Sequence, residues 1–250
     1  MSQVEQELQR FGHWMYEFDL GNGVKTPTYS ESLKQIHAVR HSMIFSFLDG
    51  IDFNYSTASV LDLACNEGYF TFEAMKRGAR YGLGIDARSS NIDKANFIKS
   101  NRKSSNCEFK VGDIYQYPYG EQKFDMVFLL GILYHVENPI GLMRLASNLT
   151  SRFLFVETQL CKTQGDIPFG WGVADRYFQG TDYCVLHQEA DSEANPLASL
   201  GGFSFVPNIS AVVSMLRAAK FRSVLQLHPN AFVQEPQYDK LDRAILVGIK

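Results

Sequence analysis

The sequence contains little cysteine, no long apolar run and no excess of basic residues. Its four cysteines are far apart and form no CxxC pair, which argues against a disulfide framework or a zinc site and favours reduced thiols. No apolar stretch is long enough to span a bilayer, and the first residues lack the apolar segment of a signal peptide. We therefore expect a soluble, cytoplasmic protein without a membrane partner.

The balance of charges limits the class of partner. Lys and Arg number 24 against 27 Asp and Glu, a formal net charge of −3. No basic excess is present to neutralise several phosphates of a nucleic acid. The composition therefore favours a small-molecule substrate over nucleic acid, without excluding a folded RNA, and it gives no indication of the oligomeric state.

The pattern from Ser59 onward is that of an α/β domain, because short apolar runs alternate with helical periodicity. The predicted strands cover residues 59–64, 81–86, 107–111, 124–130 and 152–157, and the predicted helices cover residues 70–78, 91–101 and 139–148. A late helix at 209–219 precedes two further strands, at 223–228 and 243–249. This order predicts a Rossmann-like, doubly wound and mostly parallel sheet with an antiparallel C-terminal strand.

Two segments lie outside this alternation. Residues 1–50, with a helix at about 32–47, are predicted to form an N-terminal cap segment. Residues 51–250 are predicted to form the Rossmann-like domain, with a cap insertion at about 160–206 that is too long for a passive loop. The caps carry the candidate substrate-binding residues Trp14, Tyr29, Trp171, Arg176 and Tyr177. Aromatic side chains of this kind either line an apolar pocket or pack the caps onto the core.

The first predicted strand ends in a turn of small residues that leads into a helix. Such a turn lets a nucleotide-like ligand approach the backbone amides and the helix N-terminus. The candidate cofactor residues in it are Asp62, Ala64, Asn66 and Gly68. The GxGxxG pattern of dinucleotide-binding turns is absent, which argues against a nicotinamide dehydrogenase.

Acidic residues also end the next two predicted strands. Asp86 stands about 20 residues beyond the turn, where Rossmann-like folds place the carboxylate that accepts hydrogen bonds from ribose hydroxyls. Asp113 follows the third strand. Ligands of open α/β sheets bind outside the carboxyl ends of the strands, so Asp62, Asp86 and Asp113 together outline one cofactor site.

The turn Asp62-x-Ala64-x-Asn66-x-Gly68 resembles the Asp/Glu-x-Gly-x-Gly-x-Gly turn of class I S-adenosylmethionine-dependent methyltransferases, with Ala64 and Asn66 in place of two glycines. The resemblance implies S-adenosylmethionine as the cofactor. It also implies that Asp113 binds the adenine amino group while Ile114 packs on the ring. Leu130, at the end of the fourth strand, is predicted to contact the cofactor as well.

A narrower resemblance follows the fourth strand. The stretch Gly131-Ile132-Leu133-Tyr134-His135, with Asn138-Pro139 after it, resembles the methyltransferases related to the bacterial tRNA wobble-uridine carboxymethyl-transferring enzyme. Weaker matches extend the resemblance from about Trp14 to Phe221. That enzyme holds the extra carboxylate of its cofactor with basic and tyrosine side chains. Tyr134 matches the tyrosine, but Gly201-Gly202-Phe203 stands where an arginine is expected, so ordinary S-adenosylmethionine is predicted.

Methyl transfer is an in-line displacement that requires an aligned nucleophile and, for a hydroxyl, removal of its proton. His135 is the candidate general base, the alternative being a histidine that holds its loop. Tyr134 either orients the substrate or simply packs. His37 and His41 have a spacing that can bind a metal, but no acid accompanies them. We interpret them as a solvated helix face and predict catalysis without a metal.

The sequence thus predicts a methyltransferase acting on oxygen or nitrogen of a small molecule, such as a secondary metabolite. One alternative is a tRNA wobble-uridine modifying (carboxy)methyltransferase. The other is a non-catalytic cofactor-binding protein, which the two missing glycines suggest.

Overall fold

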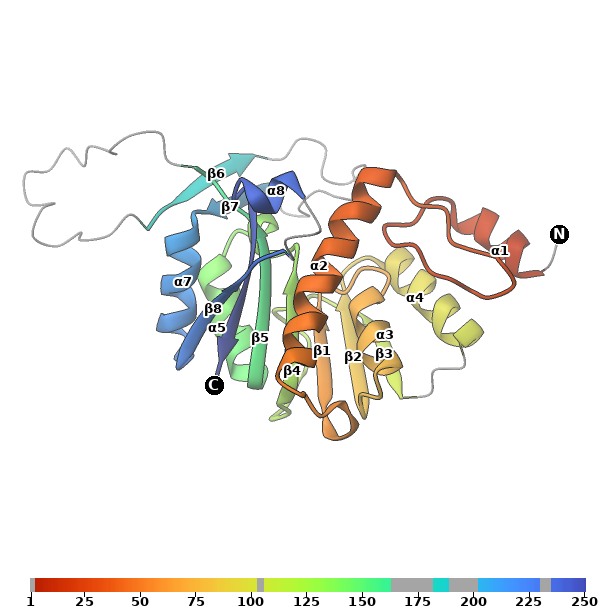
Figure 1. The fold of residues 1–250 in the computed structure, drawn as a ribbon, viewed down its shortest axis with the longest axis horizontal. Coiled ribbons are helices and arrows are strands. Elements are labelled where there is room, and N and C mark those ends of the chain that lie inside the picture. Colours follow the sequence, from red (N-terminus) through yellow and green to blue (C-terminus); the bar gives the residue numbers. More distant parts are fainter. Residues whose placement is uncertain (1–2, 103–105, 163–181, 189–201, 230–234) are drawn as a thin grey trace, which may run out of the picture.

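The computed structural model describes residues 3–102, 106–162, 182–188, 202–229 and 235–250. Its main feature is a seven-stranded sheet in the order β3-β2-β1-β4-β5-β9-β8 (Figure 1). The strands are β1 (Ser59–Leu63), β2 (Tyr81–Asp86), β3 (Cys107–Val111), β4 (Phe124–Leu130), β5 (Thr150–Gln159), β8 (Ser223–Leu227) and β9 (Arg243–Ile249). The first five are parallel, and β9 pairs antiparallel with both β5 and β8. The predicted Rossmann-like class with an antiparallel C-terminal strand is confirmed.

Helices cover both faces of the sheet. They are α1 (Gln3–Phe11), α2 (Glu31–Gly50), α3 (Tyr69–Lys76), α4 (Ser89–Arg102), α5 (Pro139–Leu149), α7 (Ile209–Ala218) and α8 (Pro236–Asp239), with short 3₁₀ turns η1 (Tyr55–Thr57) and η2 (Leu133–His135). Side chains of α2, α3 and α4 pack on one face, while those of α5 and α7 pack on the other. Two apolar cores therefore share one sheet.

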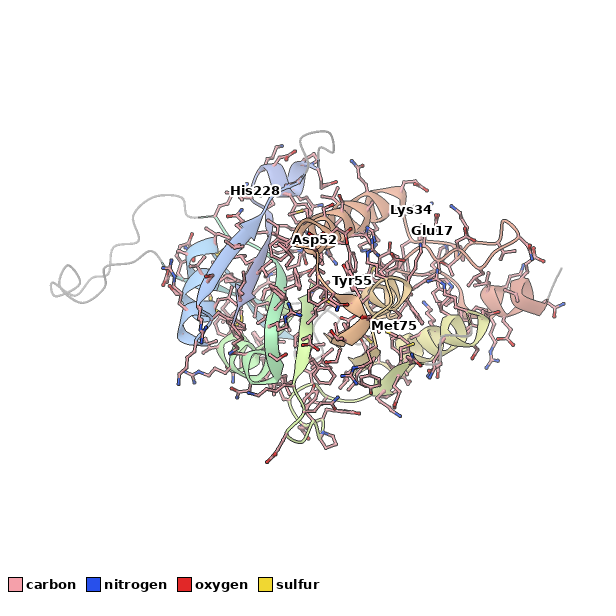
Figure 2. The ribbon with its side chains drawn as sticks, turned by 60° about the horizontal axis from the view of Figure 1, so that its bottom comes forward. Glu17, Lys34, Asp52, Tyr55, Met75 and His228 are labelled. Carbon is pink, nitrogen blue, oxygen red and sulfur yellow. The ribbon has the colours of Figure 1, made fainter. Side chains whose placement is uncertain are left out.

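The alternation of side chains along each strand explains the two cores. Val60 of β1 belongs to the first core, whereas its neighbour Leu61 belongs to the second, because successive strand residues point to opposite faces. All five residues of β1 are buried, as expected for a parallel strand covered on both faces. Side chains fill the space between the layers, and the labelled Tyr55 and Met75 pack against the first core (Figure 2).

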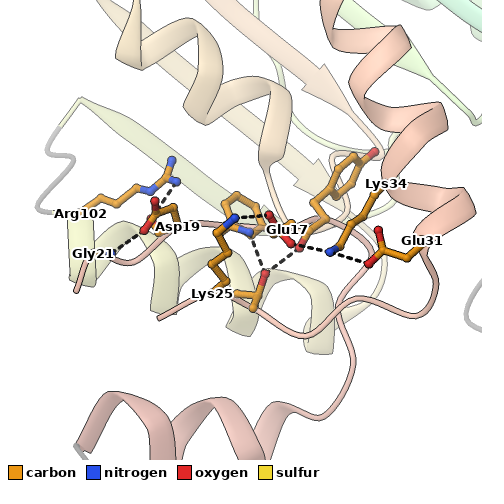
Figure 3. Close-up of polar contacts among 10 residues, drawn as sticks. Glu17, Asp19, Gly21, Lys25, Glu31, Lys34 and Arg102 are labelled. Atoms are coloured by element: carbon orange, nitrogen blue, oxygen red, sulfur yellow. Dashed lines mark hydrogen bonds and ion pairs between the residues drawn. The ribbon is translucent and has the colours of Figure 1, made fainter. Parts of the chain in front are cut away.

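The N-terminal fifty residues pack directly on the sheet. Trp14, Phe18 and Phe45 are fully or almost fully buried and share the first core with strand residues such as Phe128. Charged contacts hold the extended segment before α2 in place (Figure 3). Glu17 pairs with Lys25 at 2.8 Å and with Lys34 at 2.7 Å.

Helix α2 is longer than the predicted 32–47. It begins after Ser30, whose hydroxyl accepts a hydrogen bond from the Leu33 amide and so caps the first turn.

In the part of the chain that the structure describes, no helix combines the length and apolar character needed to cross a membrane.

A small hairpin of the insertion is an element that the sequence did not predict. β6 (Cys184–Gln188) and β7 (Phe203–Pro207) form a separate two-stranded antiparallel sheet. Residues 163–181 and 189–201 of the insertion lie outside the described residues. The pairing escaped prediction because the two strands are short and far apart in the sequence.

Candidate functional site

A cavity of about 800 Å³ lies at the carboxyl ends of the parallel strands. The β1–α3 turn contributes Ala64 and Asn66, and Asp86, Asp113 and Leu130 come from the ends or following loops of β2, β3 and β4. The wall from the N-terminal region and α2 comprises Met15, Tyr16, Leu33, Ile36, His37 and Arg40. The fold therefore brings the predicted strand-end residues together with part of the predicted cap.

The β1–α3 turn keeps a glycine-like backbone although two glycines are missing. Ala64, Asn66 and Gly68 have φ values of 58°, 51° and 77°, all in the left-handed region that ordinarily favours glycine. Ala64 and Asn66 line the cavity. Gly68 does not line it, and a Cβ there would collide with the Phe109 ring. The turn thus has the shape that the resemblance implies, with strain at two positions.

Asp86 organises this turn. Its Oδ2 accepts a hydrogen bond from the Asn66 amide at 2.9 Å, and its Oδ1 accepts from the Arg88 amide at 2.9 Å and from Asn91 Nδ2 at 3.1 Å. Burial raises the pKa of Asp86. A carboxylate offers about four acceptor positions, so one remains for a hydroxyl of a bound ligand.

The residues at the cavity fit a nucleoside cofactor. Ile114 and Leu130 both line the cavity and give apolar surface for a ring, and Asp113, which precedes Ile114 in the sequence, lines it as well. The Oδ1 atom of Asn66 is buried and has no hydrogen-bond partner in the described part of the protein. Since buried polar atoms are normally paired, this carbonyl suits a donor group of a ligand.

Asp62 lies behind the cavity wall rather than in it. It is buried at the end of β1 and accepts a hydrogen bond from Thr71 Oγ1 at 3.1 Å. Burial raises its pKa to about 7. Asp62 therefore ties β1 to α3 and stands next to the turn that approaches the cofactor.

A buried charge network forms the other end of the cavity. Arg40 Nη2 and Arg243 Nη1 lie 3.1 Å and 3.0 Å from the same oxygen of Glu157. Tyr238 donates to that oxygen at 3.1 Å, and Arg243 donates to the Tyr134 hydroxyl at 3.3 Å. Because two guanidinium groups share one carboxylate, this end of the cavity carries an excess of positive charge.

Arg40 and Arg243 were not among the candidate residues predicted from the sequence. They come from α2 and from the start of β9, and the fold brings both to the Tyr134 end of the cavity. Of the segment where an arginine was expected, Gly202 and Phe203 stand at the start of β7, and Gly201 lies outside the described residues. The sequence did contain one indication of Arg243. This charged residue begins an apolar strand, whereas Asp86 and Asp113 stand at the ends of their strands.

The interpretation of His37 and His41 as a solvated helix face is wrong. His37 is 7% exposed, lines the cavity and stacks on Tyr16 with ring centroids 4.2 Å apart. Burial and the nearby Arg40 lower its pKa to about 2, so the imidazole is neutral. His41 instead contacts Glu73 at 3.0 Å. Across the described residues, no group of three or more His, Cys, Asp or Glu side chains could hold a metal ion.

The candidate catalytic residues lie at the cavity. Tyr134 and His135 both line it, with ring centroids 4.2 Å apart. Tyr134 is 8% exposed, and burial raises its pKa, so the phenol stays protonated. His135 is half-buried in η2.

The candidate substrate-binding residues do not gather at the cavity. Trp14 is fully buried among aromatic rings, and Tyr29 is 48% exposed and stacks on His13. Neither of them lines the cavity. Trp171, Arg176 and Tyr177 lie outside the described residues.

The sheet order, the single antiparallel strand and the cavity at the strand ends define the class I methyltransferase fold. The chain belongs to the methyltransferase domain family, which it matches over residues 54–198. The resemblance to class I S-adenosylmethionine-dependent methyltransferases is thereby confirmed.

Curated relatives of the chain include tRNA U34 carboxymethyltransferases. That of Campylobacter hominis is 36% identical over 165 residues, which are 65% of this chain and 50% of the relative. That of Campylobacter curvus is 26% identical over 171 residues, 68% of this chain and 50% of the relative. The chain thus spans about half the length of these two relatives.

Solved structures with the same fold include two that were crystallised with SAH. The N-terminal domain of EvdMO1, crystallised in the presence of SAH and D-fucose, superimposes with a TM-score of 0.70 at 19% identity, covering 99% of this chain and 95% of that one. The SAH-bound magnesium protoporphyrin IX methyltransferase of Synechocystis PCC 6803 gives a TM-score of 0.58 at 17% identity, covering 100% and 95%. At these identities the similarity shows the fold.

Proposed function

We propose that the protein is an enzyme that transfers the methyl group of S-adenosylmethionine to an oxygen or nitrogen of a small molecule. The observation that carries this proposal is the convergence of Asn66, Asp86, Asp113 and Ile114 on one cavity. The SAH-bound structures of proteins with the same fold support it. The cavity volume, about 800 Å³, is within the range typical of small-molecule sites.

The residues that line the cavity support a role for each in holding one part of the cofactor. Asp86 would accept a hydrogen bond from a ribose hydroxyl, and Asp113 would accept from the adenine amino group while Ile114 and Leu130 pack on the ring. The backbone of Ala64 and Asn66 would approach the amino-acid part. When bound, the sulfonium supplies an electrophilic methyl carbon, and the protein's task is to align the acceptor with it.

The acceptor side would be formed by Tyr134, His135 and the cap segments. Tyr134, held protonated next to Arg243, would donate a hydrogen bond that orients the acceptor. His135 would remove a proton from a hydroxyl acceptor. Residues 1–50 and 160–206 would act as caps, which the cavity-lining Met15, Tyr16 and Arg40 support for the first of them.

The assignment of the cofactor is tested by calorimetry with S-adenosylhomocysteine. We expect binding by the unaltered protein and a loss of about 1–3 kcal/mol in Asp86→Ala, roughly 5- to 150-fold in Kd, because polar ligand atoms lose their buried partner. Asp93→Ala is the matched control, since Asp93 is exposed on α4. Binding of NAD in place of S-adenosylhomocysteine would contradict the proposal.

The role of His135 is tested by turnover. If His135 removes the proton of a hydroxyl, His135→Ala should lower kcat by about 10²–10⁴-fold while the affinity for S-adenosylhomocysteine stays nearly constant. The pH profile of kcat should also lose its ascending limb. The control is His228→Ala, since His228 (labelled in Figure 2) is exposed and does not line the cavity. Near-normal turnover of His135→Ala would assign His135 to holding its loop.

A second candidate, carboxymethyl transfer to tRNA, is favoured by one specific observation. Arg40 and Arg243 give the Tyr134 end of the cavity an excess of positive charge, which suits a carboxylate on the transferred group, and curated relatives are named tRNA U34 carboxymethyltransferases. Assays of bulk tRNA with S-adenosylmethionine and with its carboxylated form separate the candidates. Label transferred only from the carboxylated donor would support the second, and no transfer to tRNA from either donor would contradict it.

A further inference from the structure

The cofactor turn contains a buried carboxylate, that of Glu67, which does not line the cavity. Glu67 stands between Asn66, which lines the cavity, and Gly68, and its own side chain is only 1% exposed. Its Oε1 accepts a hydrogen bond from the Met15 amide at 2.9 Å, and its Oε2 accepts from the Tyr16 amide at 3.0 Å. One side chain thus uses both oxygens to bind two successive amides more than fifty residues away in the sequence.

A buried lysine completes this contact. Lys94 of α4 lies 3.1 Å from Glu67 Oε1 and donates to the His13 carbonyl at 2.6 Å. Its ammonium also lies 5.1 Å from the centre of the Trp14 ring. The Glu67–Lys94 pair therefore holds residues 13–16 from both the amide and the carbonyl side. Hydrogen bonds between charged and backbone groups are among the stronger ones in proteins.

The segment held in this way forms part of the cavity wall. Met15 and Tyr16 both line the cavity, and Tyr16 stacks between His37 and Tyr69 at 4.2 Å and 4.8 Å. His37 in turn hydrogen-bonds to the backbone of Met15. The other contacts of the segment, such as the Glu17–Lys34 pair and the bond from Arg102 to the Asp19 carbonyl (Figure 3), involve residues that do not line the cavity.

We propose that Glu67 is a positioning residue that fixes Met15 and Tyr16 against the cofactor turn. In this way it couples the part of the cavity wall formed by the N-terminal segment to the binding of the cofactor. This inference rests on the proposed function, because it assumes that the amino-acid part of the cofactor lies between Asn66 and Tyr16. Any shift of the turn on ligand binding is then passed directly to Tyr16 and His37, on the acceptor side. Glu67 itself does not touch the cofactor.

The test compares two probes, S-adenosylhomocysteine and adenosine, which lacks the amino-acid part. In the double variant Glu67→Gln/Lys94→Met, which removes both charges of the pair together, we expect the affinity for S-adenosylhomocysteine to fall by about tenfold or more. The affinity for adenosine should change little, since Asp86 and Asp113 are untouched. Equal losses for both probes, as general destabilisation would cause, or no loss for either, would overturn the proposal.

The matched control is Glu73→Gln/Arg77→Met, a different ion pair, between α3 and the residue that follows it, which does not line the cavity. It should bind both probes as the unaltered protein does. A second measurement needs no variant, because saturation with S-adenosylhomocysteine should slow hydrogen exchange at the Met15 and Tyr16 amides. Unchanged exchange there, with ligand bound, would overturn the inference alone. Failure of the unaltered protein to bind S-adenosylhomocysteine would instead contradict the proposed function.

Discussion

Ala64 and Asn66 both hold left-handed backbone conformations, which cost free energy for alanine and less for asparagine. An L-residue in the left-handed region is less stable than glycine by about 1–2 kcal/mol, and part of this is offset because glycine gains more freedom in the unfolded chain. Both residues line the cavity, where stored strain of this kind is common. The protein thus tolerates strain in order to place two side chains at the ligand.

Ala64→Gly should therefore stabilise the protein. We expect its free energy of unfolding in urea to rise by about 1 kcal/mol, because the strain at φ 58° is released. The comparison is Ala58→Gly, at a position with φ −83°, where glycine gains nothing in the folded state and stability should fall. A loss of stability in Ala64→Gly as large as that in Ala58→Gly would show that the turn is unstrained.

At the residue scale the sequence predicted the cavity-lining residues at the strand ends better than those near Tyr134. Asp86, Asp113 and Asn66 could be predicted because parallel strands end at one edge, so position in the sequence nearly determines position in space. Arg40 and Arg243 could not be predicted, since only the packing of α2 and the insertion of β9 beside β5 bring them to Tyr134.

At the element scale, too, features set by local sequence pattern could be predicted and features set by tertiary packing could not. The alternation of buried strands and helices from β1 to α5 is strongly periodic and was predicted to within a few residues. α1, α8 and the β6–β7 hairpin were not predicted, because they are short and depend on tertiary contacts. The error over His37 has a related cause. Helix α2 is covered by the sheet on one side and by the segment with Tyr16 on another, so polar residues on it are buried.

Helices α2 and α3 are joined by a charge cluster whose strength depends on pH. Glu73 of α3 lies 3.0 Å from both His41 Nε2 and Arg77 Nη1, and these partners hold its pKa at about 2, below the usual 4.5. A carboxyl whose pKa is lower in the folded state stabilises the protein above pH 4.5. That contribution disappears as the pH falls towards 2.

Glu73→Gln should remove this contribution. At pH 7 we expect the variant to be less stable than the unaltered protein by about 1 kcal/mol, a modest value because solvent partly screens the cluster. Urea unfolding followed between pH 7 and pH 3 should show the two proteins converging as the pH falls. A difference in stability that stays constant with pH would mean that packing, and not charge, accounts for the effect.

At the scale of the whole molecule, the N-terminal fifty residues are part of the main core. Trp14, Phe18 and Phe45 pack in the same cluster as Phe128 and Phe155 of the sheet. The cavity also draws on residues from Met15 to Arg243. Both ends of the described chain therefore contribute to the cavity wall, and the binding free energy of a ligand should stabilise the N-terminal segment and the sheet together.

Two spectroscopic probes of unfolding test whether the N-terminal segment and the sheet unfold together. In Trp171→Phe, Trp14 is the only tryptophan, so fluorescence reports on the N-terminal segment while far-UV circular dichroism reports on the whole fold. We expect the two urea transitions to coincide. S-adenosylhomocysteine at about 100 times its Kd should raise the free energy of unfolding by about 2.7 kcal/mol in both. A fluorescence transition that comes first and does not move with ligand would show that residues 1–50 unfold on their own, because a segment that unfolds before the cavity is lost cannot share its binding energy.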